Sequence, residues 1–283
     1  MSRTPIDHKI AAVSMLTEGL SLRATSRLTG LSRTRLGKLV LEMGKASERL
    51  LDEKIRGFQC EQIECDEFWT LIQKRHGRVR ATDPADVGDA WVWVAVDADS
   101  KLIPAHHVGA RRMADADAFM RQLRRRVEGE VQFNTDRLHT YRGAIFAEFS
   151  TWNGTGLDRP DWATVVKHFE TAVEAEGRYA PPRVDSVEKR AESGNPDMER
   201  ATTSHVESQH LHFRMRNKRA ARLSNAFSKS LEHLRAAPAT YYAHYNFVRT
   251  HGTIKTTPAV AGGMAERPWS LGELVEWGEM YGR

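Results

Sequence analysis

The order of strand and helix patterns after residue 61 is the feature that most limits how this chain can fold. Runs rich in apolar and β-branched residues predict strands over residues 62–69, 90–97, 101–108, 131–136 and 163–166. Apolar residues at helical spacing predict a helix over 115–127 and another through Tyr141, Ile145 and Phe146. The expected order is three strands, a helix, a strand, a helix, a strand and a last helix.

This order predicts a mixed α/β fold with helices on both faces of one sheet. The first three strands would form an antiparallel meander. In a ribonuclease-H-like domain, expected over residues 61–235, the first and fourth strands lie side by side. Asp66 and Asp136, on those two strands, would then face each other, and Glu207 would reach in from the last helix.

Three carboxylates from distant parts of the chain suit a site for divalent cations. Two Mg²⁺ or Mn²⁺ ions roughly 4 Å apart can activate the attacking oxygen and stabilise the leaving oxygen of a phosphodiester. Carboxylate oxygens are the hard ligands that Mg²⁺ prefers. Without metal the three would repel, and at least one pKa would rise. The sequence therefore predicts Asp66, Asp136 and Glu207 as catalytic metal ligands for DNA cleavage and strand transfer.

Each of these acids also has an ordinary structural interpretation. Asp66 could cap a strand end, Asp136 could form a turn, and Glu207 could make a salt bridge on a helix face. Four other acids are expected to be solvated or to form loops: Glu64, Glu67, Asp97 and Asp99. The three-residue site is favoured because the acids occur together in the expected order of elements.

The N-terminal segment carries the net positive charge of the chain. Residues 1–49 hold nine Lys and Arg residues against four Asp and Glu residues, and this excess equals the net charge of +5. The pattern predicts a DNA-binding module joined to a catalytic one. Residues 1–50 are expected to form that module, and residues 51–60 to form a linker.

The same segment has a helix-turn-helix pattern. Helical spacing over 6–17 is followed by Ser21, a suitable N-cap for the first helix of the motif. Gly30 and Ser32 suit a tight turn before the second helix of the motif. The second helix would present four residues to DNA: Arg33, Thr34, Arg35 and Lys38. The alternative is a small helical bundle with an ordinarily charged face.

A strongly basic stretch follows Glu207. Residues 208–223 contain five Lys and Arg residues and no acid. A helix through them would place His210, Arg214 and Lys218 near the side of Glu207, where they could contact the DNA backbone. The alternative is a solvated charged face.

Two further segments complete the expected organisation. Residues 170–203 are polar and contain proline, and they are expected to form a mobile insert. Residues 236–283 are expected to form a helical C-terminal extension. Its aromatic stretch over 241–247 is expected to pack in the core rather than to stack on bases, and residues 268–277 are expected to form a docking helix.

Several motifs in the second half of the chain resemble those of a known family. They are HVESQHL over 205–211, RMRN over 214–217, NAFSKS over 225–230, YAHYNFVRTH over 242–251 and TPA over 257–259, together with CDEFW over 65–69 and WVW over 91–93. They are similar to DDE transposases of bacterial insertion sequences, of the insertion sequence one kind. The resemblance implies that Asp66, Asp136 and Glu207 are the acidic triad, within a ribonuclease-H-like fold that cuts and joins DNA at element ends.

The resemblance also sets expectations for partners and location. They are double-stranded DNA, as element ends and as target, and a homodimer or larger assembly. The zinc-binding motif that such proteins often carry is absent, since Cys60 and Cys65 are the only cysteines. Without an apolar membrane-spanning run or a signal peptide, a cytoplasmic, nucleoid-associated protein with no membrane contact is expected.

Three rival functions remain open on the sequence. The first is a non-catalytic helix-turn-helix regulator derived from a transposase. The second is a metal-dependent nuclease of the same fold that hydrolyses without joining. A third is a hydrolase that uses two carboxylates on sugars, for which the basic N-terminus has no evident use.

Overall fold

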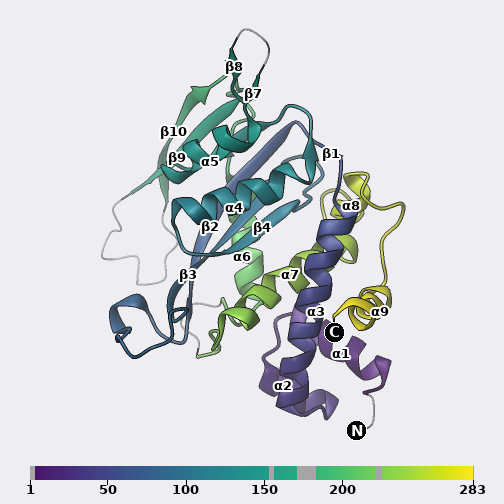
Figure 1. The fold of residues 1–283 in the computed structure, drawn as a ribbon. Helices are drawn as coiled ribbons and strands as arrows, with labels where there is room; N and C mark the ends of the chain where they lie inside the picture. The colour runs from purple at the N-terminus through teal and green to yellow at the C-terminus, as the bar shows by residue number, and fades with distance from the viewer. Residues whose placement is uncertain (1–3, 153–155, 171–182, 221–224, 283) are drawn as a thin grey trace.

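The computed structural model describes residues 4–152, 156–170, 183–220 and 225–282. A six-stranded mixed sheet with the strand order β10-β9-β6-β2-β3-β4 forms the centre of the structure (Figure 1). Its strands are β2 (Gln62–Ile72), β3 (Gly88–Asp97), β4 (Ala105–Gly109), β6 (Gln132–Thr135), β9 (Trp162–Phe169) and β10 (Val184–Ser193).

Strand pairing confirms the two features of the sheet that matter for the site. β2, β3 and β4 form the predicted antiparallel meander. β6 lies parallel to β2, and β9 lies parallel to β6, so the expected first and fourth strands are neighbours. The pairing of β2 with β6 ends at Cys65 and Thr135. Asp66 and Asp136 each come directly after these paired residues.

Helices cover both faces of the sheet. In Figure 1, α4 (Met113–Arg124) and α5 (Thr140–Phe149) lie in front of it, and α6 (Ser204–Arg216) and α7 (Leu231–Phe247) lie behind. β3 serves both layers because its successive side chains point to opposite faces. Trp93 belongs to the larger apolar cluster with α4 and α5, whereas Val92 and Val94 pack with residues of α6 and α7.

Three helices precede the sheet: α1 (Ile6–Thr17), α2 (Leu22–Thr29) and α3 (Arg33–Lys54). The predicted caps and turn are present. The hydroxyls of Ser21 and Ser32 accept hydrogen bonds from the backbone N–H groups of Ala24 and Arg35, each at 3.2 Å. Gly30 has a φ of 72°, which glycine adopts without steric cost. α3 then continues without interruption into the expected linker and ends at Lys54.

α3 is held closely by the C-terminal helices. A Cβ on Gly44 would lie only 2.3 Å from the Cβ of Ala236, so this glycine permits the close crossing of α3 and α7. α9 (Leu271–Tyr281) also packs on α3, where the Trp277 indole donates to the carbonyl of Ala46 at 2.9 Å. The predicted C-terminal helix therefore docks on the long N-terminal helix.

The aromatic stretch of α7 is buried, as predicted. Tyr241, Tyr242, Tyr245 and Phe247 are each at most 3% exposed. Their contacts with neighbouring aromatic rings account for this burial. This stretch therefore supports the sheet from behind and offers no base-stacking surface.

Several element boundaries differ from the predicted ones. The third strand begins at Ala105, because Lys101 has a φ of 62° in a turn closed by its N–H to the Asp97 carbonyl. The first helix after the sheet meander spans Met113–Arg124 rather than 115–127. The remaining short elements are β1 (Phe58–Gln59), η1 (His76–Arg78), β5 (Val127–Glu128), β7 (Thr151–Trp152), β8 (Leu157–Asp158) and α8 (Pro258–Ala261).

The expected insert over 170–203 contains part of the sheet. Residues Val184–Ser193 form β10, which pairs antiparallel with β9 along its length. The expectation of a mobile excursion is wrong for these residues, because their backbone groups are used in the sheet. The expectation for residues 171–182 falls outside the described residues. Within the described part of the chain, no helix combines the length and apolar character needed to cross a membrane.

Candidate active site

Two of the three predicted acids meet where β6 ends beside β2. Carboxylate oxygens of Asp66, Glu67 and Asp136 all lie within 4.8 Å of one another, and we call these three residues the acid cluster. Asp66 and Glu67 lie on the part of β2 that continues past its pairing with β6. Asp136 follows β6 and accepts a hydrogen bond from the Leu138 N–H at 2.8 Å. The structure therefore brings the predicted aspartates together.

Glu67 was expected to be solvated, and this expectation is wrong. Its side chain is buried, and its carboxylate accepts hydrogen bonds from the Arg111 Nε at 2.7 Å and the Tyr141 hydroxyl at 2.9 Å. The signal was available in the sequence. Ile63, Cys65 and Glu67 alternate along β2, so an apolar face at the first two positions places Glu67 on the same face.

The pKa values of Glu67 and Asp136 are raised; the sequence predicted that at least one pKa would rise among grouped carboxylates. Burial, together with the charges of Asp136 and Asp66, raises the pKa of Glu67 to about 8, although Arg111 opposes this. Burial and the charge of Asp66 also raise the pKa of Asp136. Burial and mutual repulsion thus disfavour the charged forms of Glu67 and Asp136.

Glu207 lies outside this cluster in the structure. It is on α6, with its side chain 43% exposed, and Lys167 Nζ contacts it at 2.5 Å. The Thr203 hydroxyl donates to its other oxygen at 2.8 Å. Lys167 is on β9, three residues beyond Thr164, which pairs with Thr135. Glu207 is thus tied to β9, the strand next to β6, on the part of β9 that continues past its pairing with β6.

His210 lies close to the acid cluster instead of on the exposed side of α6. Its Nδ1 is 3.3 Å from a carboxylate oxygen of Asp66, its ring packs on Phe68 with centroids 4.9 Å apart, and the residue is 5% exposed. His210 is three residues from Glu207 on α6, but it is buried with Val206 and Phe213, whereas Glu207 is partly exposed.

Glu64 was also expected to be solvated, and it is fully buried. Its carboxylate accepts hydrogen bonds from the backbone N–H groups of His205 and Val206 at 2.8 and 3.0 Å, and His205 Nδ1 lies 2.6 Å away. The carboxylate thus satisfies the free N–H groups at the start of α6. Glu64 fixes the helix that carries Glu207 and His210 to strand β2.

The other two acids agree with their predictions. Asp97 is buried and forms a turn, accepting the Ser100 N–H at 2.7 Å. Asp99 is exposed and pairs with Arg200 at 2.9 Å. Neither contacts the acid cluster.

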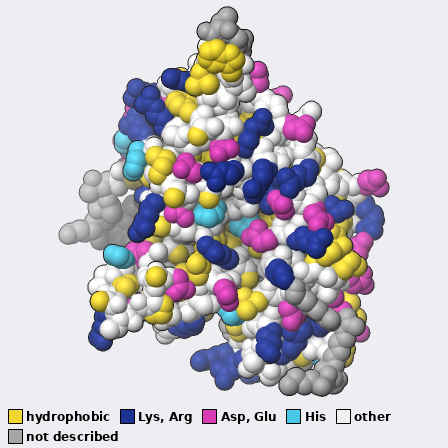
Figure 2. Space-filling view, viewed as in Figure 1, with side chains coloured by type: hydrophobic (Ala, Val, Ile, Leu, Met, Phe, Trp, Pro, Cys, Tyr) yellow, Lys and Arg dark blue, Asp and Glu magenta, His cyan; other side chains and the backbone are white. Residues whose placement is uncertain are grey.

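The predicted DNA-contacting residues of α3 lie at its beginning. Arg33, Thr34 and Lys38 are exposed, whereas Arg35 is held by Glu42 at 2.8 and 3.0 Å. In Figure 2, Lys and Arg side chains gather at the lower edge of the view, over α2 and the start of α3. This face has the charge that a phosphate backbone would need.

The basic stretch after Glu207 is shorter as a helix than predicted. α6 ends at Arg216, and the Asn217 N–H bonds to the Phe213 carbonyl. Arg214 lies over the Phe68 ring at 4.9 Å, one turn from His210. Lys218 is exposed beyond the helix end, so helical spacing does not relate it to Glu207. The part of this stretch at 221–224 lies outside the described residues.

Comparisons with known proteins give limited likeness. No family model matches the sequence, and no curated protein matches it. A Mos1 transposase paired-end complex with the left transposon end is 13% identical, with a TM-score of 0.21, over 51% of this chain and 58% of that chain. A Mos1 mariner paired-end complex with Mn is 14% identical, with a TM-score of 0.21, over 51% and 57%. The chain thus spans less than two thirds of these structures, and the site must be judged by its own geometry.

Proposed function

We propose that the protein is a DDE-type DNA transposase that binds the ends of a mobile element and performs metal-dependent cleavage and strand transfer. The observation that carries the proposal is the grouping of Asp66 and Asp136, with Glu67, within 4.8 Å where β6 ends beside the parallel strand β2. The proposed fold is ribonuclease-H-like, and the strand order β9-β6-β2-β3-β4, extended by β10, supports it.

The donor set of the acid cluster fits hard divalent cations. The Asp66 and Asp136 side chains are 21% and 37% exposed, so both carboxylates are partly accessible to solvent. The raised pKa of Asp136 indicates negative charge that a cation would stabilise. Asp66, Asp136 and Glu207 are the proposed ligands of two Mg²⁺ or Mn²⁺ ions. Such ions would lower the pKa of the attacking water or 3′ hydroxyl and stabilise the leaving oxygen.

The other predicted residues have supporting roles in this proposal. Arg33, Thr34, Arg35 and Lys38 would contact the element ends from α3. Arg214 and Lys218 would hold the backbone near the cut. His210 would contact the DNA from its position beside Asp66. The proposed organisation is a DNA-binding module over 1–50, a linker over 51–60, a catalytic domain over 61–235 and an extension over 236–283.

The proposal also includes the assembly and the compartment. Two element ends must be joined, so a homodimer or larger assembly on double-stranded DNA is proposed. Its place of action would be the cytoplasm, at the nucleoid.

A donor plasmid that carries the gene with its native flanking DNA tests the function. Purified protein with Mg²⁺ or Mn²⁺ is expected to nick the flanking ends and to join them to a target plasmid. Asp66→Asn, Asp136→Asn and Glu207→Gln are each expected to reduce joining by about a thousandfold or more, because each removes a ligand charge. Asp99→Asn makes the same chemical change at an exposed acid outside the cluster and should leave joining unchanged.

The outcomes separate the rival functions. Cleavage without joining would indicate a nuclease of the same fold. Sequence-specific binding of the flanks, with no cleavage by the wild type, would indicate a regulator that has kept the acids. Full joining by Asp66→Asn would contradict the proposed active site.

A further inference from the structure

The side chain of Arg111 makes direct contacts with two members of the acid cluster. Its Nε donates to a Glu67 oxygen at 2.7 Å, and its Nη2 lies 3.5 Å from a carboxylate oxygen of Asp136. The guanidinium thus bridges a carboxylate on β2 and one that follows β6. Arg111 is not among the residues that the sequence predicted for this site.

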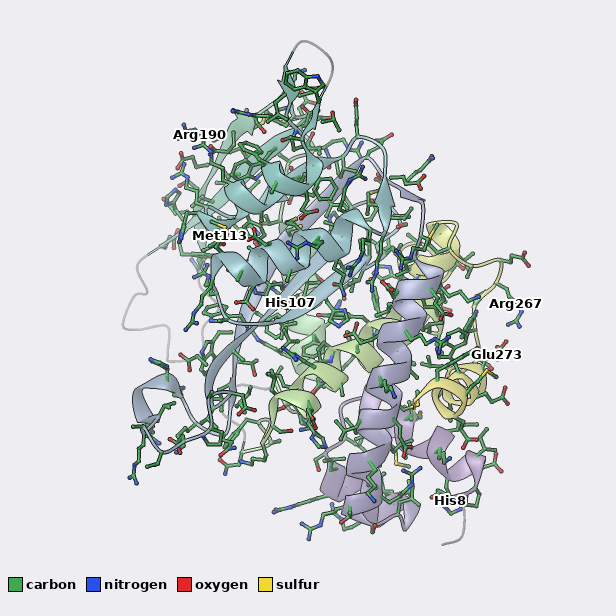
Figure 3. All side chains as sticks on the ribbon, viewed as in Figure 1. His8, His107, Met113, Arg190, Arg267 and Glu273 are labelled. Carbon is green, nitrogen blue, oxygen red and sulfur yellow. The ribbon has the colours of Figure 1, made fainter. Side chains whose placement is uncertain are left out.

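The backbone that carries Arg111 is fixed, whereas its side chain is partly free. The residue lies in the short loop between β4 and α4, which Figure 3 brackets with the labelled residues His107 and Met113. The Trp93 indole donates to the neighbouring Ala110 carbonyl at 3.1 Å. The Arg111 side chain is 38% exposed, and its guanidinium lies over the Trp91 ring, 4.8 Å from the centroid. Rotation of the side chain alone would carry it away from the carboxylates.

Glu67 would keep a partner after such a rotation. The Tyr141 hydroxyl donates to its second oxygen at 2.9 Å from a buried position on α5. Asp136 would likewise keep the Leu138 N–H at 2.8 Å. The oxygens that Arg111 contacts are therefore the ones that would become open to another cation.

We propose that Arg111 takes the place of a divalent cation at the acid cluster and must leave Asp136 before the metal binds there. The inference rests on the proposed function, because it assumes that the acid cluster is a metal site. Arg111 is then a positioning residue: it holds the carboxylates of Glu67 and Asp136 together and competes with the metal for them. A guanidinium brings one charge and donates only N–H groups, so a divalent ion has the electrostatic advantage once it is present.

Titration of the full-length protein with Mn²⁺, by calorimetry and by the EPR signal of free Mn²⁺, tests the proposal. Arg111→Ala is expected to bind Mn²⁺ about tenfold more tightly than the wild type, because an opposing charge within contact distance is removed. Arg111→Lys keeps the charge but cannot bridge two carboxylates, and its affinity should lie between the two.

Matched variants separate this effect from a general change of charge. Arg112→Ala removes the adjacent exposed arginine and should change the affinity by less than about twofold, as expected for an exposed charge. Asp136→Asn should weaken Mn²⁺ binding whether or not Arg111 is present. Melting in EDTA and in Mn²⁺ checks folding, and Mn²⁺ should stabilise Arg111→Ala more than it stabilises the wild type.

The possible results decide both proposals. Unchanged or weaker Mn²⁺ binding by Arg111→Ala, or equal tightening by Arg112→Ala, overturns the role of Arg111 and leaves the proposed function standing. If neither the wild type nor Arg111→Ala binds Mn²⁺ at millimolar concentration, both proposals fail. Tighter binding by Arg111→Ala with no DNA joining by the wild type supports the role of Arg111 and counts against the transposase.

Discussion

Strand β2 carries three acids within four residues, and their side chains lie in two different environments. Glu64 receives two backbone N–H groups and a histidine at the start of α6. Asp66 and Glu67 instead lie against another carboxylate, Asp136, with one bridging arginine. A buried acid with enough hydrogen-bond donors stabilises the fold. Acids packed against each other repel, and a positive charge would relieve that repulsion.

The largest expected effect on stability concerns Glu67. Its pKa in the folded protein is about 8, above the ordinary value, so between about pH 4.5 and pH 8 the folded state binds a proton that the unfolded state has lost. Stability should therefore fall as pH rises through this window, by on the order of 4 kcal/mol in the absence of metal. Chemical denaturation in EDTA from pH 5 to pH 9 measures this slope.

Glu67→Gln provides the comparison for that slope. Glutamine cannot ionise but can still accept the Tyr141 hydroxyl, so the variant should lose most of the decline with pH. An unchanged slope in the variant would mean that Glu67 is not the group that titrates, and the contrast between the two kinds of acid would lose its main support.

Glu64→Ala should cost on the order of 3 kcal/mol of stability, because two buried N–H groups and His205 lose their acceptor. The loss should be the same with and without Mn²⁺, since Glu64 belongs to the fold rather than to the proposed metal site. Denaturant melts under both conditions measure this. A loss that disappears on addition of Mn²⁺ would place Glu64 with the acid cluster after all.

Asp136→Asn should increase stability in the absence of metal, in contrast to Glu64→Ala. Relief of repulsion from Asp66 should stabilise the protein by about 0.5 kcal/mol, a small value because the side chain is partly exposed to solvent. The variant should also lose the stabilisation that Mn²⁺ gives the wild type. Thermal melts in EDTA and in Mn²⁺ show both effects, and destabilisation in EDTA would indicate that Asp136 is structural, as Glu64 is.

Asp99→Asn should have the smallest effect on stability among these variants. Its pair with Arg200 lies on the surface, and such pairs contribute little. The Tm should change by less than about 2 °C at either metal condition. A larger change would show that charge removal at any acid perturbs this protein, and the other comparisons would need correction for it.

The sheet could be predicted from the sequence because its signals are local. Strands β2 and β3 are long runs rich in apolar residues, and β6 is a short run around Phe133; the order of the strands was enough to place Asp66 beside Asp136. The caps at Ser21 and Ser32 and the turn at Gly30 were also predictable, since each depends on a few neighbouring residues. Strand β10 was missed because its residues are exposed and polar, without the apolar alternation that marks a half-buried strand.

The parts of the site that could not be predicted depend on contacts between distant segments. The position of Glu207 against Lys167 requires β9 and α6 to meet, and nothing near either residue encodes that distance. Arg111 reaches the acid cluster from a loop whose position is set by Trp93. The burial of His210 beside Asp66 could not be predicted, because spacing gives relative angles along a helix but not which face meets the sheet.

In the proposed function, the uninterrupted α3 would set a distance along the DNA. At about 1.5 Å per residue, its 22 residues make a rod roughly 33 Å long, close to one turn of double helix. Near its C-terminal end the helix contacts the sheet, where Glu48 lies 3.0 Å from His106. If its N-terminal end binds an element terminus, as proposed, the length of α3 would fix the number of base pairs between the recognised sequence and the cut.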